Sequence, residues 1–299
     1  MKHTLKIVAI LLGMFLITQL IGLAVVHVYA SNNDNLPYGM EPPKDLKPET
    51  SLFSIIFAIV IAVALMLLLM SLKIEFFLRL WFFFVVVVAL GITINAALMG
   101  FSYASYIAIA LALPLAILKV FKRNILVHNL TELLIYPGIA VIFVPLLNVW
   151  TISLLLVLIS VYDIYAVWHS GIMQKMAKYQ IKQLKVFSGF FVPYFGKKEK
   201  ELITKAQNSK SAALKGKKLK LKLNLAILGG GDVVFPIIFS GVVFRAMGLV
   251  PALITTLTAT LALAFLFYIS KKGKFYPAMP FISAGCFIGL ALASLLAQV

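Results

Sequence analysis

Nine apolar runs divide the chain, and each is long enough, or nearly long enough, to cross a lipid bilayer. A bilayer core about 30 Å thick requires about 20 helical residues at 1.5 Å each. The runs cover residues 5–29, 51–71, 79–99, 102–118, 125–146, 149–169, 223–245, 249–269 and 276–297. They predict an all-α fold, a polytopic helical bundle with nine transmembrane helices.

Composition excludes the soluble alternatives. Hydrophobic residues make up 62% of the 299 positions and charged residues only 12%, whereas soluble domains average about 45–50% and about 25%. The single cysteine, Cys286, excludes an internal disulfide and a cysteine metal cluster. The four histidines are scattered. We therefore expect no metal and no cofactor.

The formal net charge of +17 follows the predicted topology. If the N-terminus is cytoplasmic, 24 of the 27 lysines and arginines fall on the cytoplasmic side, 14 of them in residues 171–222. This asymmetry obeys the positive-inside rule. It predicts an integral protein of the cell membrane with residues 171–222 cytoplasmic and the C-terminus outside. The charge faces anionic lipid headgroups, and because no recognition motif accompanies it, we expect no nucleic-acid partner.

The basic loop also divides the chain. We expect a six-helix part over residues 1–170, the cytoplasmic loop over 171–222 and a three-helix part over 223–299. Residues 28–30 resemble a signal-peptidase site. The preceding apolar stretch is longer than the usual 7–15 residues of a signal peptide, however. We therefore expect the first helix to be retained.

Two aspartates, Asp163 and Asp232, lie well inside apolar runs. An ionisable group at such depth costs at least roughly 2.5–3.5 kcal/mol, so it is a functional candidate by default. Helical geometry places them about 9 Å and about 15 Å from the cytoplasmic boundary. They can therefore meet in the cytoplasmic half of the membrane.

Two facing carboxylates share one proton, because like charges a few ångströms apart cannot both ionise. The ionised member can take a proton from water while the protonated member protonates a scissile amide. Such a pair titrates as a unit, so acid and base are not assigned to individual residues.

The residues around the aspartates favour water-accessible chemistry. Gly229, Gly230 and Gly231 precede Asp232, and Pro236 follows it. Glycine and proline weaken a helix, and irregular backbone at membrane depth is tolerated only where protein buries it or water lines it. Tyr162 offers a hydroxyl beside Asp163. The segment Pro277-Ala278-Met279-Pro280 begins the ninth run, and its unpaired backbone groups could pair with an extended substrate.

In this order, Tyr162-Asp163, Gly229-Gly230-Gly231-Asp232 and Pro277-Ala278-Met279 resemble the YD, GxGD and PAL motifs. These motifs mark the presenilin and signal peptide peptidase family of intramembrane aspartyl proteases. The resemblance covers nearly the whole chain, and the orientation resembles a microbial, archaeal presenilin homologue. It implies an aspartic endopeptidase whose catalytic residues are Asp163 and Asp232.

The same resemblance implies that single-span membrane-protein substrates are locally unwound and cut within their transmembrane helices. Tyr162, the three glycines and residues 277–280 would then contact the substrate. The presenilin branch elsewhere works with accessory subunits. The sequence leaves accessory subunits and homo-oligomers open, and it leaves open whether the basic loop is cut.

The third motif departs from the family pattern, because Met279 replaces leucine. Methionine conserves volume and apolarity, so we expect the role to survive. A literal Pro251-Ala252-Leu253 occurs at the outer start of the eighth run, far from the aspartates on this topology. We interpret it as a coincidental helix start.

Three alternatives use the same aspartates. A proton- or cation-coupled transporter also uses midplane carboxylates, but it should show internal symmetry, and no repeat is evident. A prepilin-peptidase-type protease carries GxGD but should lack the third motif. The aspartates could also form a purely structural pair. Glu132, near the inner end of the fifth run, is interpreted as a paired or snorkelling residue, with a third site carboxylate as the alternative.

Overall fold

The computed structural model describes residues 5–40, 47–72, 75–122, 124–170, 179, 187–195, 223–270 and 276–296. In this part of the chain, nine helices are long and apolar enough to cross a membrane. They are α1 (Leu5–Ala30), α2 (Pro48–Ser71), α3 (Glu75–Leu98), α4 (Ala104–Phe121), α5 (Ile125–Phe143), α6 (Val149–Tyr165), α9 (Gly230–Met247), α10 (Leu249–Ile269) and α11 (Met279–Leu296). The predicted nine-helix membrane bundle is confirmed.

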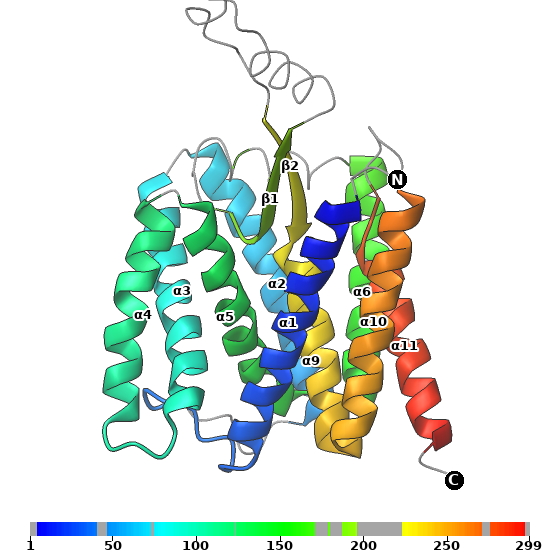
Figure 1. Cartoon of the computed structure of the whole chain (residues 1–299), viewed down its shortest axis with the longest axis horizontal. Coiled ribbons are helices and arrows are strands. Elements are labelled where there is room, and N and C mark those ends of the chain that lie inside the picture. Colours follow the sequence, from blue (N-terminus) through cyan, green and yellow to red (C-terminus); the bar gives the residue numbers. More distant parts are fainter. Residues whose placement is uncertain are drawn as a thin grey trace, which may run out of the picture.

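Two short helical turns and two strands complete the described elements. The turns are η1 (Val144–Leu146) and η2 (Ala166–Ser170), and the strands are β1 (Gly189–Phe195) and β2 (Leu223–Gly229). The strands lie at the end of the bundle where α1 begins, and α11 finishes at the opposite end (Figure 1). We call these the strand end and the distal end.

The strands correct one predicted boundary. The seventh span was expected over 223–245, but residues 223–229 form β2, which pairs antiparallel with β1 from Gly189↔Gly229 to Phe195↔Leu223. A short apolar run bounded by glycine does not by itself distinguish a buried strand from a helix. The helical span therefore begins at Gly230. The rest of the loop 171–222, apart from Tyr179 and residues 187–195, lies outside the described residues.

Helix α9 lies at the centre of the bundle and packs against α1, α5, α6, α10 and α11. Its side chains Val233, Ile237, Phe239 and Val243 are fully buried. In contrast, α2 exposes large apolar side chains along its length, as a helix in contact with lipid can. The core therefore fixes α9, the helix that carries Asp232, from several sides.

Side-chain caps mark the starts of the two helices that precede the strands. Asn148 and Thr151 form a capping box at α6, in which each side chain bonds the other residue's backbone. Asn124 caps α5 by accepting from the N–H groups of Leu126 and Val127. These caps fix where α5 and α6 enter the bundle.

Candidate active site

Asp163 lies at the strand end of α6, two residues before that helix ends at Tyr165 and continues as the π-helical turn η2. Its side chain is buried, and its Oδ2 accepts a hydrogen bond of 3.1 Å from the backbone N–H of Met279. The N–H of Ala278 also faces this carboxylate. The first N–H groups of a helix lack intrahelical partners, so the start of α11 provides donors that orient Asp163.

Asp232 occupies the first turn of α9, directly after β2 ends at Gly229. Its side chain is partly exposed, and the N–H of Gly229, the residue that caps α9, faces its carboxylate. A carboxylate in this position also favours the helix, because the N-terminus carries a partial positive charge. The strand-to-helix junction therefore sets where Asp232 lies.

The two aspartates come together at the strand end. Helix α6 packs against α9, and α11 packs against both. The carboxylates of Asp163 and Asp232 are close enough to interact electrostatically. Their positions along the chain predict similar depths in the membrane, and the contact of these three helices brings them together.

The glycine run joins the strand pair to α9. Gly230 donates from its N–H to the carbonyl oxygen of Ser188, at 3.3 Å. A Cβ at Gly230 would lie 2.6 Å from Ser188 Oγ and 2.8 Å from the hydroxyl of Tyr136. This close approach requires glycine. Gly230 is buried, whereas Gly231 is exposed and Gly229 is intermediate.

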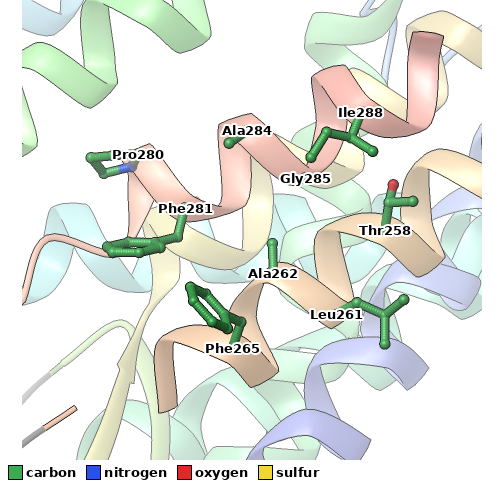
Figure 2. A pocket seen from close by; sticks show the side chains of 9 residues that line it. All are labelled: Thr258, Leu261, Ala262, Phe265, Pro280, Phe281, Ala284, Gly285 and Ile288. Carbon is green, nitrogen blue, oxygen red and sulfur yellow. The ribbon is translucent and has the colours of Figure 1, made fainter. Parts of the chain in front are cut away.

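The remaining predicted site residues lie around Asp163. Pro277 and Met279 are buried, and Ala278 is partly exposed. Tyr162 is 49% exposed on the surface of α6. Pro280 lines an apolar groove of about 560 Å³ between α10 and α11, together with Phe265 and Phe281 (Figure 2). The third motif therefore borders both the Asp163 carboxylate and the apolar groove between α10 and α11.

Close packing of α10 and α11 supports this arrangement. A Cβ at Gly285 would lie 2.6 Å from Ala262 Cβ and 2.7 Å from the carbonyl oxygen of Thr258, which are on α10. Ser160 of α6 donates to Ser283 Oγ of α11 at 2.9 Å. This serine pair is not predictable from the sequence, because single serines in apolar runs carry no spacing signal.

The other tripeptide, Pro251-Ala252-Leu253, lies in the first turns of α10 at the distal end. Helix α9 separates it from Asp232. At the same end, Arg245 forms an ion pair with Asp34, with its Nη1 2.7 Å from both carboxylate oxygens. The structure thus places this second match away from the aspartates, as the topology predicted.

Glu132 is fully buried in α5 and forms an ion pair with Lys119 of α4. Its Oε1 also lies 3.7 Å from His128 Nε2. The interpretation of Glu132 as a paired residue is therefore confirmed.

Comparisons with known proteins agree with this geometry. The family model described as signal-peptide peptidase, presenilin aspartyl protease matches residues 12–299. A search of curated protein sequences returned no match.

Two solved structures of a presenilin family intramembrane aspartate protease share the fold. The crystal form in space group C222 is 20% identical, with a TM-score of 0.63, and the match covers 97% of this chain and 99% of that one. The P2 form is 19% identical, with a TM-score of 0.61 and 96% coverage of both chains. Because the family model extends over nearly all of the sequence, the chain belongs to the signal-peptide peptidase and presenilin aspartyl protease family and is an intramembrane aspartyl protease.

Proposed function

We propose that Asp163 and Asp232 are the catalytic pair of this protease. The observation that carries the proposal is their arrangement at the strand end, where the two carboxylates interact electrostatically while the N–H of Met279 orients Asp163. The described ion pairs include no cation on either aspartate. Two neighbouring carboxylates without a countercharge share one proton, which is the protonation state that hydrolysis requires.

The reaction needs no covalent intermediate. The ionised carboxylate takes a proton from a water molecule as the water oxygen adds to the scissile carbonyl carbon. The protonated carboxyl polarises the carbonyl, and a proton then passes to the amide nitrogen as the C–N bond breaks. The products are a carboxylic acid and an amine, and the pair is left with one proton.

The substrate of this proposal is a single transmembrane helix that unwinds locally at the strand end. Gly229, Gly231 and Tyr162 border the site on the α9 and α6 sides, and Pro277–Pro280 borders it on the α11 side. Gly230 contributes by packing against Ser188 and Tyr136. A helix must unwind to be cut, because its carbonyls are otherwise bonded along the helix and shielded by side chains.

Cleavage of a single-span reporter by purified protein in liposomes tests the pair. We expect the wild type to cleave it and Asp163→Ala and Asp232→Ala to show no cleavage. Asp34→Ala serves as the matched control, since it removes a carboxylate at the distal end. Cleavage that persists in either aspartate variant contradicts the proposal, and so does a folded wild type that cuts no reporter.

We also propose that the strand end is cytoplasmic. The start of α1 and the end of α4 lie at this end (Figure 1), and they carry Lys6 and Lys119 with Lys122, in agreement with the positive-inside rule. Cys286 is buried, so new cysteines can be labelled selectively. A membrane-impermeant thiol reagent added to intact cells should label Ser31→Cys but not Leu72→Cys. The reverse pattern contradicts the orientation.

A further inference from the structure

The outer edge of β1 and the outer edge of β2 differ in their contacts with the rest of the fold. An exposed strand edge presents unpaired N–H and C=O groups that can pair with another extended chain. In an antiparallel pair, alternate residues direct these groups toward the partner strand and away from it. The outward-directed groups therefore decide where a third strand can join.

Hydrogen bonds identify which residues of β1 face outward. The N–H of Gly230 donates to Ser188 across the pair, so Ser188 faces inward. The backbone carbonyls of Gly189 and Phe191 in β1 instead form hydrogen bonds with side chains of α5. Alternation then places Gly189, Phe191 and Pro193 on the outer edge of β1.

Asn129 of α5 occupies both backbone groups of Phe191. Its Nδ2 donates to the Phe191 carbonyl oxygen at 2.8 Å, and its Oδ1 accepts from the Phe191 N–H at 3.0 Å. These are the two bonds that an added strand would make at this residue. Asn129 thus takes the place of a third strand.

His128 and Pro193 close the positions on either side. His128 Nε2 lies 2.7 Å from the Gly189 carbonyl oxygen, and because a carbonyl only accepts, Nε2 is the protonated nitrogen. His128 Nδ1 is then the acceptor for Lys119 Nζ at 3.4 Å. Pro193 has no N–H to offer. At each of three successive outward positions of β1, at least one backbone group is therefore not available to an added strand.

Buried groups hold this closure in place. Lys119 contacts His128 and forms the ion pair with Glu132, and both charged side chains are almost completely buried. The ring of Phe191 packs on His128, with centroids 4.9 Å apart. The charged cluster thus orients His128 toward β1.

The outer edge of β2 ends beside Asp232, because β2 is followed directly by α9. Ile227 pairs with Phe191, so its N–H and C=O also point away from the partner strand. Its side chain is exposed, and two residues later Gly229 faces the Asp232 carboxylate. A strand added here would run past the aspartate.

We propose that Asn129, supported by His128, is a positioning residue that closes the outer edge of β1 and so confines an extended substrate to the β2 edge. This inference rests on the proposed catalytic pair. Confinement to one edge gives the substrate one register relative to Asp232. Loss of the closure opens a second edge and admits other registers.

The first test compares Asn129→Ala with Asn124→Ala in the reporter assay. Asn124 is a matched control, because it is an asparagine near the start of the same helix that accepts two backbone N–H groups. Mass spectrometry of the products reports which bonds are cut. For Asn129→Ala we expect additional cleavage sites and a kcat/KM about tenfold lower, as two lost hydrogen bonds would give. The Asn124 variant should keep the wild-type sites.

A second variant separates edge closure from a general structural role. Phe191→Pro removes the N–H that Asn129→Ala exposes, so the double variant again has no donor at this position for an added strand, without the asparagine. We expect the double variant to recover the narrow set of cleavage sites. If Asn129 only stabilised the fold, Phe191→Pro would not restore the narrow set of cleavage sites. A cleavage pattern that stays broad in the double variant therefore overturns the proposal.

Hydrogen–deuterium exchange provides a readout that is independent of cleavage. The Phe191 amide should exchange faster in Asn129→Ala, which removes its acceptor, and should stay protected in Asn129→Asp, which keeps an acceptor oxygen and loses only the donor to the Phe191 carbonyl. Unchanged exchange, or unchanged cleavage sites in an active Asn129→Ala, overturns the edge closure. Failure of the catalytic pair is distinct, since it appears as persistent cleavage in the Asp163→Ala and Asp232→Ala variants.

Discussion

Two carboxylate sites near the strand end have opposite electrostatic surroundings: Glu132 faces a lysine, and Asp163 faces a second aspartate. Glu132 is fully buried and pairs with Lys119, which comes from a neighbouring helix. Asp163 is also buried, but its carboxylate accepts from the backbone N–H of Met279, and the charged group that interacts with it is Asp232. A countercharge makes a carboxylate structural, whereas a second carboxylate leaves a proton to be shared.

The energetics explain why both arrangements persist in one bundle. A buried ion pair can be nearly neutral for stability, but removal of one partner is costly because the other charge is left behind. A pair of carboxylates is not stabilised in this way. The proposed hydrolysis requires that water reach this pair, and Asp232 is partly exposed.

The largest expected effect is on catalysis. Asp163→Asn and Asp232→Asn each remove the carboxylate without changing its volume. We expect cleavage to fall by at least about 10²–10⁴-fold, the contribution of general acid–base catalysis, while thermal unfolding in detergent shifts little. A variant that loses activity only in proportion to its folded fraction would contradict the comparison.

The next effect is on stability. Glu132→Gln leaves the buried Lys119 ammonium without its countercharge. We expect the free energy of unfolding to fall by about 3–5 kcal/mol, with measurable cleavage by the protein that remains folded. Thermal unfolding followed by circular dichroism measures this loss. The double variant Glu132→Leu and Lys119→Met removes both charges and should recover most of the stability, and a double variant no more stable than Glu132→Gln would argue against a structural ion pair.

The pH dependence of cleavage further distinguishes the aspartate pair from Glu132. At low pH both aspartates are protonated and no base remains, and at high pH both are ionised and no acid remains. The wild-type kcat/KM should therefore decrease on both sides of an optimum, by about tenfold per pH unit in the limbs. The double variant at Glu132 and Lys119 should keep the same profile. A limb that disappears in that variant would place Glu132 in the catalytic machinery.

The smallest effect concerns the ion pair at the distal end. Arg245 and Asp34 are partly exposed, with side-chain accessibilities of 35% and 19%. Pairs of this kind contribute about 0–1 kcal/mol. Arg245→Met should therefore lower the unfolding temperature only slightly and leave the cleavage sites unchanged. A large loss of activity would show that the two ends of the bundle are coupled.

Much of the bundle could be predicted from local sequence, and one part of the seventh span could not. The eighth span was predicted at residues 249–269, which are the bounds of α10. The apolar run predicts a helix over residues 223–229, but these residues pair with a strand whose nearest member, Phe195, lies 28 positions before its partner Leu223. An apolar run carries the same signal in either structure, and only the strand it meets decides between them.

The site shows the same division. Asp163 and Asp232 were identified because their apolar surroundings make an ionisable group costly. The contacts of Met279 with Asp163 and of Asn129 with Phe191 join residues 116 and 62 positions apart. No periodicity or motif predicts that these distant residues contact each other, so the positioning residues of α5 are not predictable from the sequence.

The sequence by itself determined that nine segments are long and apolar enough to cross a bilayer, as the described helices bear out, and which two carboxylates lie well inside such segments. Those properties depend on the transfer free energy of each segment, which composition sets. Only the tertiary structure decided which carboxylate received a countercharge, which received another carboxylate, and which edge of the strand pair α5 closed. These outcomes depend on which helices pack together, because side chains from distant segments become partners only where packing brings their atoms within a few ångströms of each other.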